Sequence, residues 1–311
     1  MKKILCVLMS CLLFVMAGCS GHSKNLKFGA ADIGGVYYSF ASTFTQLADN
    51  EIDGYTFETK TTAGSVANLR LISDGYIDLA IVQADLLSDA YNATGTFADK
   101  KYQKGYKAVA SLYTECCQIV VRKDSGITGI DDLINKTVSV GASESGTEKN
   151  AEQILKMSGI TDELINKVNM DYTEAAEKLK AGEIDAFFCT AGTRTEVIGQ
   201  LSKECDIRLI SLDDKCIDKM LSAYSLCEKY TIPAGTYNGQ DSDVTTIGVK
   251  AVLIAKQSLS DDVIKNVTKT IYEHADDFKY ATSLDISFDS LLYRAWHQCF
   301  DRIILYIRLM L

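Results

Sequence analysis

Short apolar runs alternate with segments of helical periodicity along most of this 311-residue chain. The apolar runs read as strands at residues 26–29, 55–61, 79–82, 108–113, 118–122, 137–140, 186–189, 207–210 and 246–255. Helical spacing of apolar residues occurs at 38–48, 66–73, 148–157, 174–181, 196–202 and 261–278. This alternation is typical of α/β proteins, so the sequence predicts mainly parallel sheets with helices on both faces.

One pattern occurs twice in the chain, as ISDGYIDLAIVQAD at 72–85 and LKAGEIDAFFCTAG at 179–192. Each copy reads as a helix end, a Gly, an Ile-Asp pair and an apolar strand with a polar end, and Gly commonly closes a helix. The repeat favours two lobes built on one plan. Chance similarity between two α/β units is the alternative.

Three strands end in small polar loops that open helices: GAADIGGVYY at 29–38, TTAGSVANLR at 61–70 and GASESGTEKN at 141–150. A helix start leaves about four backbone N–H groups unpaired and carries roughly half a positive charge, which suits a carboxylate or phosphate. In the first loop, Gly35 lets a ligand approach the backbone and Tyr37 offers a flat wall with a hydroxyl. Each loop alone reads as a plain N-cap, but three together predict an anion-binding cleft.

Polar residues at other strand ends add candidates for the same cleft. Gln83 follows an apolar run, and its amide both donates and accepts hydrogen bonds. Asp85 either meets a ligand ammonium or caps the following helix. Tyr113 ends another strand near the expected passage between the lobes.

The N-terminus indicates export. MKK precedes an apolar run at 4–17 and the sequence MAGCS, the proportions of a signal peptide rather than of a membrane span of about 20 residues. The Met-Ala-Gly-Cys motif resembles a bacterial lipobox. It predicts a lipoprotein signal peptide at 1–18, a lipid-anchored Cys19 and a tether at 19–25, outside the cytoplasmic membrane. An uncleaved anchor or ordinary secretion is the alternative.

Charge and cysteine content exclude several classes of protein. Without Lys2 and Lys3 the chain keeps 30 of its 32 basic residues against 41 acidic ones, a net charge of −11, which argues against a nucleic-acid partner. Beyond Cys19 there are seven cysteines, at positions 116, 117, 189, 205, 216, 227 and 299, with no CxxC pair. The three histidines are scattered, so no metal site is expected. We favour buried small hydrophobic residues over a disulfide framework.

Motifs for catalysis or cofactors do not occur. No histidine lies near Ser65, Ser143 or Ser145 in the sequence, and there is no GxSxG elbow, GxGxxG loop or GK[ST] phosphate loop. The sequence therefore predicts a protein that is not an enzyme, with no catalytic residues and no cofactor.

Six stretches resemble the TAXI family, the solute receptors of TRAP transporters: GGVYYSFASTF, TTAGSVANLRLISDGYIDLAIVQAD, VASLYTECCQIVVRKDSGITGIDDL, VSVGASESGTEKNAEQIL, GEIDAFFCTAG and IPAGTYNGQDSDVTTIGVKAVL. They cover about residues 26 to 280 in family order. The resemblance implies a two-lobed periplasmic-binding-protein fold of type II-like architecture. One lobe would hold residues 26–115 and 235–311, the other 116–234. It also implies a receptor that hands a glutamate- or glutamine-like amino acid or carboxylate to a membrane permease.

The resemblance also implies which residues bind the ligand. Its first-lobe positions match Tyr37, Ser65, Asn68 and Gln83, and its second-lobe positions match Ser143, Ser145, Gly146, Thr147 and Gly192. We expect the lobes to close around crossovers near 115–118 and 230–235. The tail RAWHQCFDRIILYIRLML departs from the family pattern, through a frameshift or truncation near residue 289 or through ordinary divergence. A surface lipoprotein with this fold but no transport role is the alternative function.

Overall fold

The computed structural model describes residues 23–98 and 105–284. The predicted signal peptide, Cys19, Cys299 and the divergent tail lie outside these residues. Within the described ranges, no helix combines the length and the apolar character needed to cross a bilayer.

The first part of the chain forms β1 (Lys24–Gly29), α2 (Val36–Glu51), β2 (Tyr55–Lys60), α3 (Ser65–Ser73), β3 (Leu79–Gln83) and α4 (Ala84–Asn92). The long strand β4 (Tyr106–Arg122) then leads to β5 (Thr137–Ser139), α5 (Gly146–Met157), β6 (Asn166–Val168), α6 (Tyr172–Ala181), β7 (Ala186–Ala191), α7 (Glu196–Glu204), β8 (Ile207–Leu209), α8 (Asp214–Ala223) and β9 (Cys227–Ile232). The second long strand, β10 (Val244–Lys256), is followed by α9 (Asp261–Glu273) and α10 (Ala275–Thr282).

The strands form one sheet in the order β2-β1-β3-β10-β4-β7-β5-β6, with β8 paired to β4 and β9 to β10. Strand β1 pairs in parallel with β2 and β3, and β5 pairs in parallel with β6 and β7. All pairings of β4 and β10 are antiparallel. The predicted α/β fold is confirmed. The sheet is mixed rather than mainly parallel, because its two central strands, β4 and β10, run antiparallel to each other and to their other neighbours.

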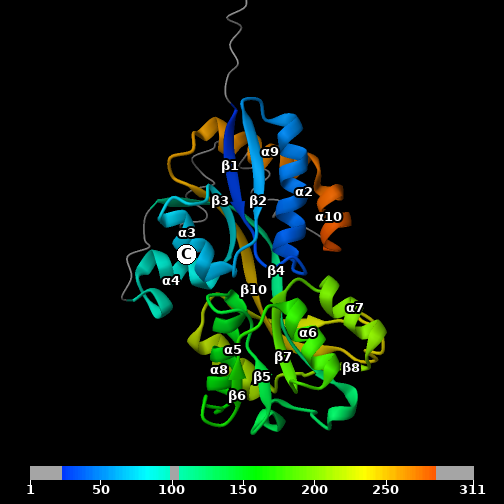
Figure 1. Ribbon diagram of the computed structural model, residues 1–311. Helices are drawn as coiled ribbons and strands as arrows, with labels where there is room; N and C mark the ends of the chain where they lie inside the picture. Colours follow the sequence, from blue (N-terminus) through cyan, green and yellow to red (C-terminus); the bar gives the residue numbers. More distant parts are fainter. Residues whose placement is uncertain (1–22, 99–104, 285–311) are drawn as a thin grey trace, which may run out of the picture.

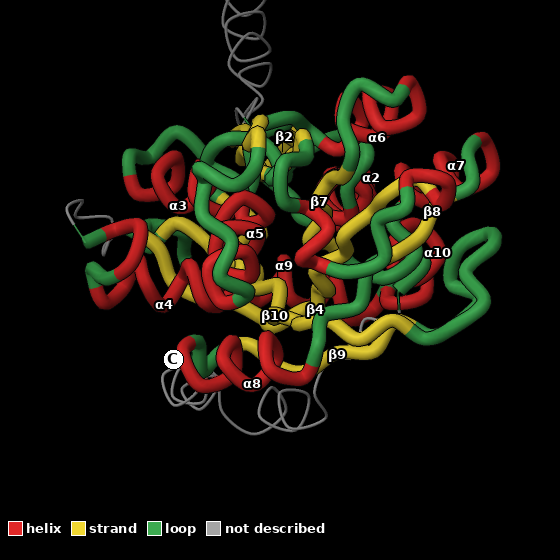
Figure 2. Tube along the Cα trace, turned by 90° about the horizontal axis from the view of Figure 1, so that it is seen from below, coloured by secondary structure: helices red, strands yellow, loops and turns green. Residues whose placement is uncertain are grey.

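The elements form two groups along β4 and β10 (Figure 1). One group holds β1 to β3 with α2, α3, α4, α9 and α10, and the other holds β5 to β9 with α5 to α8. In the second group α5 and α8 lie on one side of the strands and α6 and α7 on the other, as Figure 2 also shows. This layering brings the ends of strands and the starts of helices from both groups to one junction.

The predicted lobe boundaries fall close to these two strands. The first, between residues 115 and 116, lies inside β4. Residues just after the second, at 234/235, contact the second group: the Tyr237 hydroxyl donates to Gln118 Oε1 (2.6 Å) and Asn238 Nδ2 donates to the Ser202 carbonyl (2.8 Å). We therefore propose that the chain returns to the first lobe within β10, near Val249, rather than near residues 230–235.

Aromatic packing fixes α2 against the sheet. Phe40 and Phe44 lie four residues apart on one face of the helix, as packing against a sheet requires. The ring of Phe44 packs edge-on against Phe28 (5.5 Å) and Phe57 (5.4 Å), and Phe40 stacks on Phe278 (4.5 Å). Burying such a side chain contributes about 1.5–3 kcal/mol. These contacts fix the helix whose first turn reaches the junction.

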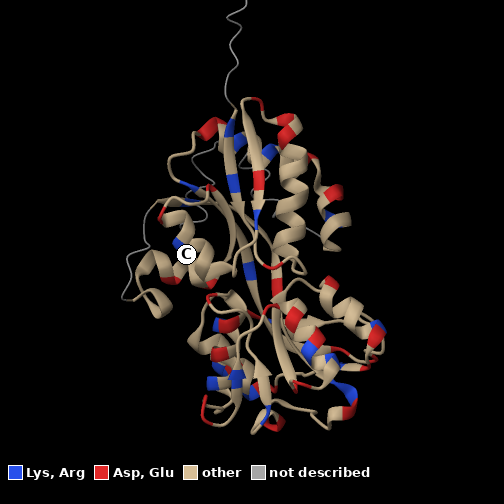
Figure 3. Ribbon diagram, viewed as in Figure 1, with Lys and Arg blue, Asp and Glu red and all other residues tan. Residues whose placement is uncertain are grey.

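The cysteines of the described residues are free thiols, at 116, 117, 189, 205, 216 and 227, and all but Cys205 are buried. This confirms the interpretation as small buried residues for five of these six, and Cys205 is half-buried. Basic and acidic residues are interspersed along the chain in both groups of elements (Figure 3).

Candidate functional site

A cavity of about 40 Å³ lies where the two groups of elements meet. Its lining from the first group is Ala31, Asp32, Gly35, Val36, Tyr37, Ala63, Gly64, Ser65, Gln83 and Glu115, and from the second group Ala142, Ser145, Gly146, Thr147, Asp171, Tyr172, Thr190 and Ala191. The cavity is therefore shared between segments far apart in the sequence.

Three helix starts line this cavity. Gly35 is the N-cap of α2, Ser65 is the first residue of α3, and Ser145 is the N-cap of α5. Gly64, before α3, has φ +119°, a conformation that favours glycine, and a Cβ there would lie only 3.5 Å from Ser145 Cα. The α3 and α5 starts thus approach each other closely at the cavity, and helix starts are where backbone N–H groups lack intrahelical partners.

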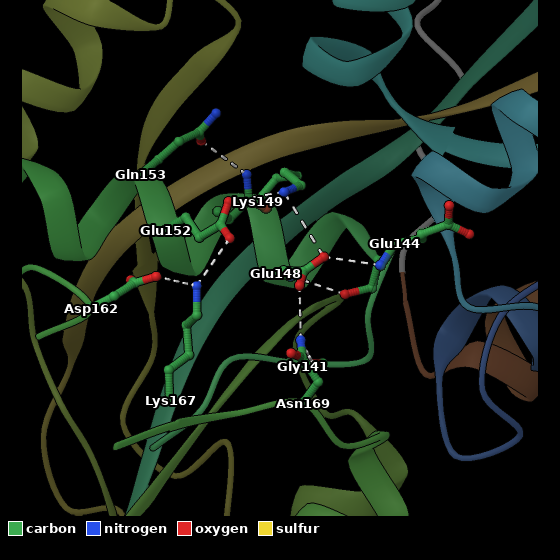
Figure 4. Close-up of polar contacts among 11 residues, drawn as sticks. Gly141, Glu144, Glu148, Lys149, Glu152, Gln153, Asp162, Lys167 and Asn169 are labelled. Carbon is green, nitrogen blue, oxygen red and sulfur yellow. Dashed lines mark hydrogen bonds and ion pairs between the residues drawn. The ribbon is translucent and has the colours of Figure 1, made fainter. Parts of the chain in front are cut away.

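A polar network holds the loop that begins α5 (Figure 4). Asn169 Nδ2 donates to the Gly141 carbonyl (2.9 Å) and to Glu148 Oε1 (2.9 Å). Glu148 Oε2 accepts from the backbone N–H of Glu144 (2.9 Å), and the Glu148 N–H donates to Ser145 Oγ (2.9 Å). These hydrogen bonds hold the loop in place, and with it the position of Ser145 at the cavity.

Tyr37 and Glu115 form the polar centre of the first-group wall. The Tyr37 hydroxyl donates to Glu115 Oε2 (2.8 Å) and lies 3.5 Å from Ser65 Oγ, and both Tyr37 and Glu115 are buried. Ser65 Oγ accepts from the backbone N–H of Gln83 (3.1 Å). Burial raises the pKa of Glu115 to about 8; hydrogen bonds from Tyr37 and Gln83 oppose this effect, and the Asp85 carboxylate adds to it.

The second-group wall is held by a chain of hydroxyl groups. The Tyr172 hydroxyl donates to the Thr190 carbonyl (2.9 Å) and lies 2.6 Å from Thr147 Oγ1. Thr147 Oγ1 also accepts from the Thr190 N–H (3.1 Å). The hydroxyl of Thr147 is thus already hydrogen-bonded to protein groups. Thr147 therefore offers a ligand its backbone rather than its hydroxyl.

Seven of the twelve predicted ligand-binding residues line the cavity: Gly35, Tyr37, Ser65, Gln83, Ser145, Gly146 and Thr147. They come from both groups of elements, as the lobe assignment of these residues expects. That they bind a ligand stays a prediction.

The structure places the other five elsewhere, three of them in buried structural positions. Asn68 donates to the carbonyls of Ala30 (2.7 Å) and Ile81 (2.9 Å) and so ties the ends of β1 and β3 together. Tyr113 is buried in β4 and is not part of the lining. The Gly192 carbonyl accepts from Thr195 Oγ1 (2.6 Å), next to the lining residue Ala191.

The remaining two are a half-buried carboxyl and an exposed serine. Asp85 Oδ1 accepts from the Leu86 N–H (2.8 Å), and burial raises the pKa of Asp85 to about 6. Asn150 of α5 donates to Asp85 Oδ2 at 3.5 Å, which is a contact between the two groups. Ser143 is exposed on the outer side of its loop, because Ser145 is the N-cap of α5.

Sequence reasoning missed four polar lining residues, Asp32, Glu115, Asp171 and Tyr172, whereas Thr190 is a polar strand end that the sequence does point to. Glu115 carried a usable signal, since it follows the apolar run that ends at Tyr113 and acidic residues are almost never fully buried without a partner. Asp32 lay in a quoted loop. Burial raises its pKa, and the Asp171 carboxylate adds to this effect. Within the described residues, no group of three or more His, Cys, Asp or Glu side chains is arranged to hold a metal ion.

Direct contacts join the two groups beside the cavity. Arg70 Nη2 forms an ion pair with Glu144 Oε2 (2.7 Å), and the Ala67 N–H donates to the Glu144 carbonyl (3.1 Å). Gln83 Nε2 donates to Asn150 Oδ1 (3.0 Å). The two groups are therefore in direct contact beside the cavity.

The chain matches a model of the NMT1-like family over residues 28–292. Among solved structures, a periplasmic transporter shares 14% identity at a TM-score of 0.59, over 85% of this chain and 88% of that one. A Bordetella bronchiseptica protein shares 17% identity at a TM-score of 0.55, over 84% of this chain and 76% of that one. A proposed L-cystine ABC transporter from Listeria monocytogenes shares 14% identity at a TM-score of 0.53, over 85% of this chain and 96% of that one. These likenesses show the fold, and the family match covers most of the sequence: the chain belongs to the NMT1-like family and has a periplasmic-binding-protein fold.

Proposed function

We propose that this protein is an extracytoplasmic solute receptor of the TAXI type. It binds a small amino acid or carboxylate, glutamate- or glutamine-like, between two lobes and delivers it to a TRAP permease. The observation that supports this most is the convergence of three helix starts, at Gly35, Ser65 and Ser145, on one cavity. The serine hydroxyls accept backbone N–H groups rather than pairing with a base, which fits a binding role and not catalysis.

Closure of the lobes follows from the energy that binding needs. A micromolar receptor requires about 8 kcal/mol. One helix start contributes roughly 0.3–1 kcal/mol, or up to about 2 when partly buried, and a hydrogen bond to a charged group about 1.5–3 kcal/mol. Two or three helix starts and several such hydrogen bonds together reach about 8 kcal/mol only where water is excluded from the site. We propose that the lobes hinge within β4 and β10 and close through the contacts of Arg70 and Gln83.

The location and the partner follow from the N-terminal sequence and the family resemblance. We propose cleavage after residue 18 and lipid attachment at Cys19, which would anchor the receptor to a bacterial membrane, in the periplasm or at the cell surface. A Cys19→Ala variant is expected to leave the membrane fraction. Recovery of this variant with the membranes would contradict the lipid anchor.

The class of the permease partner distinguishes a TRAP receptor from an ABC transporter receptor. A TRAP permease gene beside this one, and co-purification of the two proteins, would support the TAXI assignment. Co-purification with an ABC permease would favour the transporter class named for the Listeria fold relative. A receptor-fold lipoprotein without transport would copurify with neither.

Calorimetry with amino acids and small carboxylates tests the binding site, using protein without residues 1–19, a deletion that removes none of the described residues. Ser145→Ala and Gln83→Ala are expected to weaken the best ligand about tenfold, since each removes a polar group of the cavity. Ser143→Ala is the matched control, because Ser143 lies in the same loop but outside the lining. Thermal unfolding of each variant separates lost binding from the lost cap of α5. Unchanged affinity in both cavity variants would contradict the site.

A further inference from the structure

Three carboxyl groups line the cavity, those of Asp32, Glu115 and Asp171, and Glu115 is the fully buried residue among them. Glu115 is 2% exposed and lines the cavity at the point where β4 passes between the two groups. Among the described residues that line this cavity there is no Lys, Arg or His. Glu115 accepts a hydrogen bond from Tyr37 but has no cationic partner in the lining. A buried carboxylate without a cation is costly, so either it holds a proton or a ligand supplies the positive charge.

The nearby basic residues have other partners. Lys250 pairs in register with Thr114, and neighbouring residues of a strand point to opposite faces. Its Nζ contacts Glu228 Oε1 (3.2 Å). Arg70 pairs with Glu144 on the outer side of the α3 and α5 starts. Neither of these basic residues neutralises Glu115.

Several buried acceptors share the cavity with Glu115. Gln83 Oε1, Thr190 Oγ1 and Asp32 Oδ2 are buried without a hydrogen-bond partner, and all three residues line the cavity. Gln83 is 1% and Thr190 4% exposed. An ammonium group has three N–H donors and no acceptor, so it complements a set of oxygens of this kind. The helix starts in the same cavity supply the N–H donors that a carboxylate needs.

We infer that Glu115 is the counter-ion for a protonated amine of the ligand and thereby selects amino acids over carboxylates that lack the amine. This inference rests on the proposed receptor function and makes Glu115 its specificity-determining residue. Asp85, for which the sequence left open a ligand ammonium or a helix cap, lies outside the lining and contacts Asn150.

Proton release gives this pairing a signature. The titratable groups that act on Glu115, or on which it acts, come from several elements: Tyr37, Asp85, Tyr113, Cys116, Tyr172 and Cys189. Burial raises the pKa values of the tyrosines and cysteines, so they stay neutral at pH 7, whereas Asp85, with a pKa of about 6, is mostly ionised. With its pKa at about 8, Glu115 is mostly protonated at pH 7 without ligand, and an arriving ammonium would expel that proton.

The test uses calorimetry at pH 7 with two matched pairs of probes, glutamate with glutarate and alanine with propionate. Measurements in phosphate and in Tris give the number of protons released. For the pair that binds, the amino acid is expected to bind about tenfold or more tightly than its deaminated partner, with release of up to one proton. Glu115→Gln should reduce this preference about tenfold and abolish the release. Glu163→Gln, an exposed change far from the cavity lining, should alter neither.

The outcomes separate this inference from the proposed function. Equal binding of the deaminated probes, or a preference that survives Glu115→Gln in a variant with normal thermal unfolding, would overturn the role of Glu115 and leave the receptor function standing. Failure of all four probes to bind the unchanged protein would overturn both proposals.

Discussion

At the scale of single residues, Glu115 couples the stability of the ligand-free protein to pH. Its pKa is about 8 in the folded chain against an ordinary value of 4.5, because burial disfavours the charged form. Between these values the folded state binds more protons than the unfolded state, so stability falls as pH rises from 4.5 to about 8. Asp85 acts in the same direction between 3.8 and about 6.

The first prediction follows from that sign. Between pH 6.5 and 8, where Asp85 is already mostly ionised, the melting temperature of the ligand-free protein is expected to fall. Each kcal/mol lost from the free energy of unfolding lowers the melting temperature by roughly 4–8 °C for a small domain and by less for a larger chain. Glu115→Gln should flatten this slope and melt at a higher temperature than the unchanged protein at pH 8. Differential scanning calorimetry across this range measures both. An equally steep slope in the variant would show that another group titrates.

Residues also show how far the sequence could predict the site. Ser145 could be chosen over Ser143 from the sequence alone, because Ser145 and Glu148 have the Ser-x-x-Glu spacing of a helix start. Asn68 could not be excluded in that way. A buried amide near a helix start looks the same whether it faces a ligand or ties two strands together, and only the tertiary packing decides.

At the scale of elements, local patterns predicted most helices and strands, while pairings distant in the sequence remained hidden. The runs at 108–113 and 118–122 are one strand, β4, since the polar residues between them lie at the passage between the groups. The predicted helix at 261–278 is two, because His274 separates α9 from α10. The antiparallel pairings of β4 and β10 depend on contacts over more than a hundred residues, which periodicity does not report.

The second prediction concerns the loop that begins α5. Asn169→Ala removes the bonds to the Gly141 carbonyl and to Glu148, and at about 1 kcal/mol each the loss is roughly 1–3 kcal/mol. Because Asn169 does not line the cavity, any loss of ligand affinity would report a displaced Ser145. Asn166→Ala is the control, as its bond goes to Thr137 Oγ1 (3.2 Å) away from the loop. Calorimetric affinities equal in both variants would show that the loop holds its place without Asn169.

At the scale of the whole molecule, the two groups meet through few polar contacts, several of them partly exposed. The side chains of Arg70 and Glu144 are 34% and 40% exposed, so their ion pair contributes only about 0–1 kcal/mol. The close approach of Gly146 to Gln83 is better protected, since both residues are buried. Closure therefore depends more on the fit of these buried surfaces and on the ligand than on the outer ion pair.

The last prediction uses this fit. A Cβ at position 146 would lie 2.3 Å from Gln83 Oε1 and 2.4 Å from its Cδ, so Gly146→Ala must either displace the Gln83 amide, which bonds Asn150, or hold the lobes apart. Both consequences are expected to weaken ligand binding about tenfold or more, with thermal unfolding of the ligand-free protein little changed. Gly199→Ala is the matched control, because nothing lies within 4 Å of its added Cβ. In small-angle scattering with saturating ligand, the unchanged protein and the control should become more compact. Full compaction and full affinity in Gly146→Ala would mean that the ligand does not need the approach of α5 to Gln83.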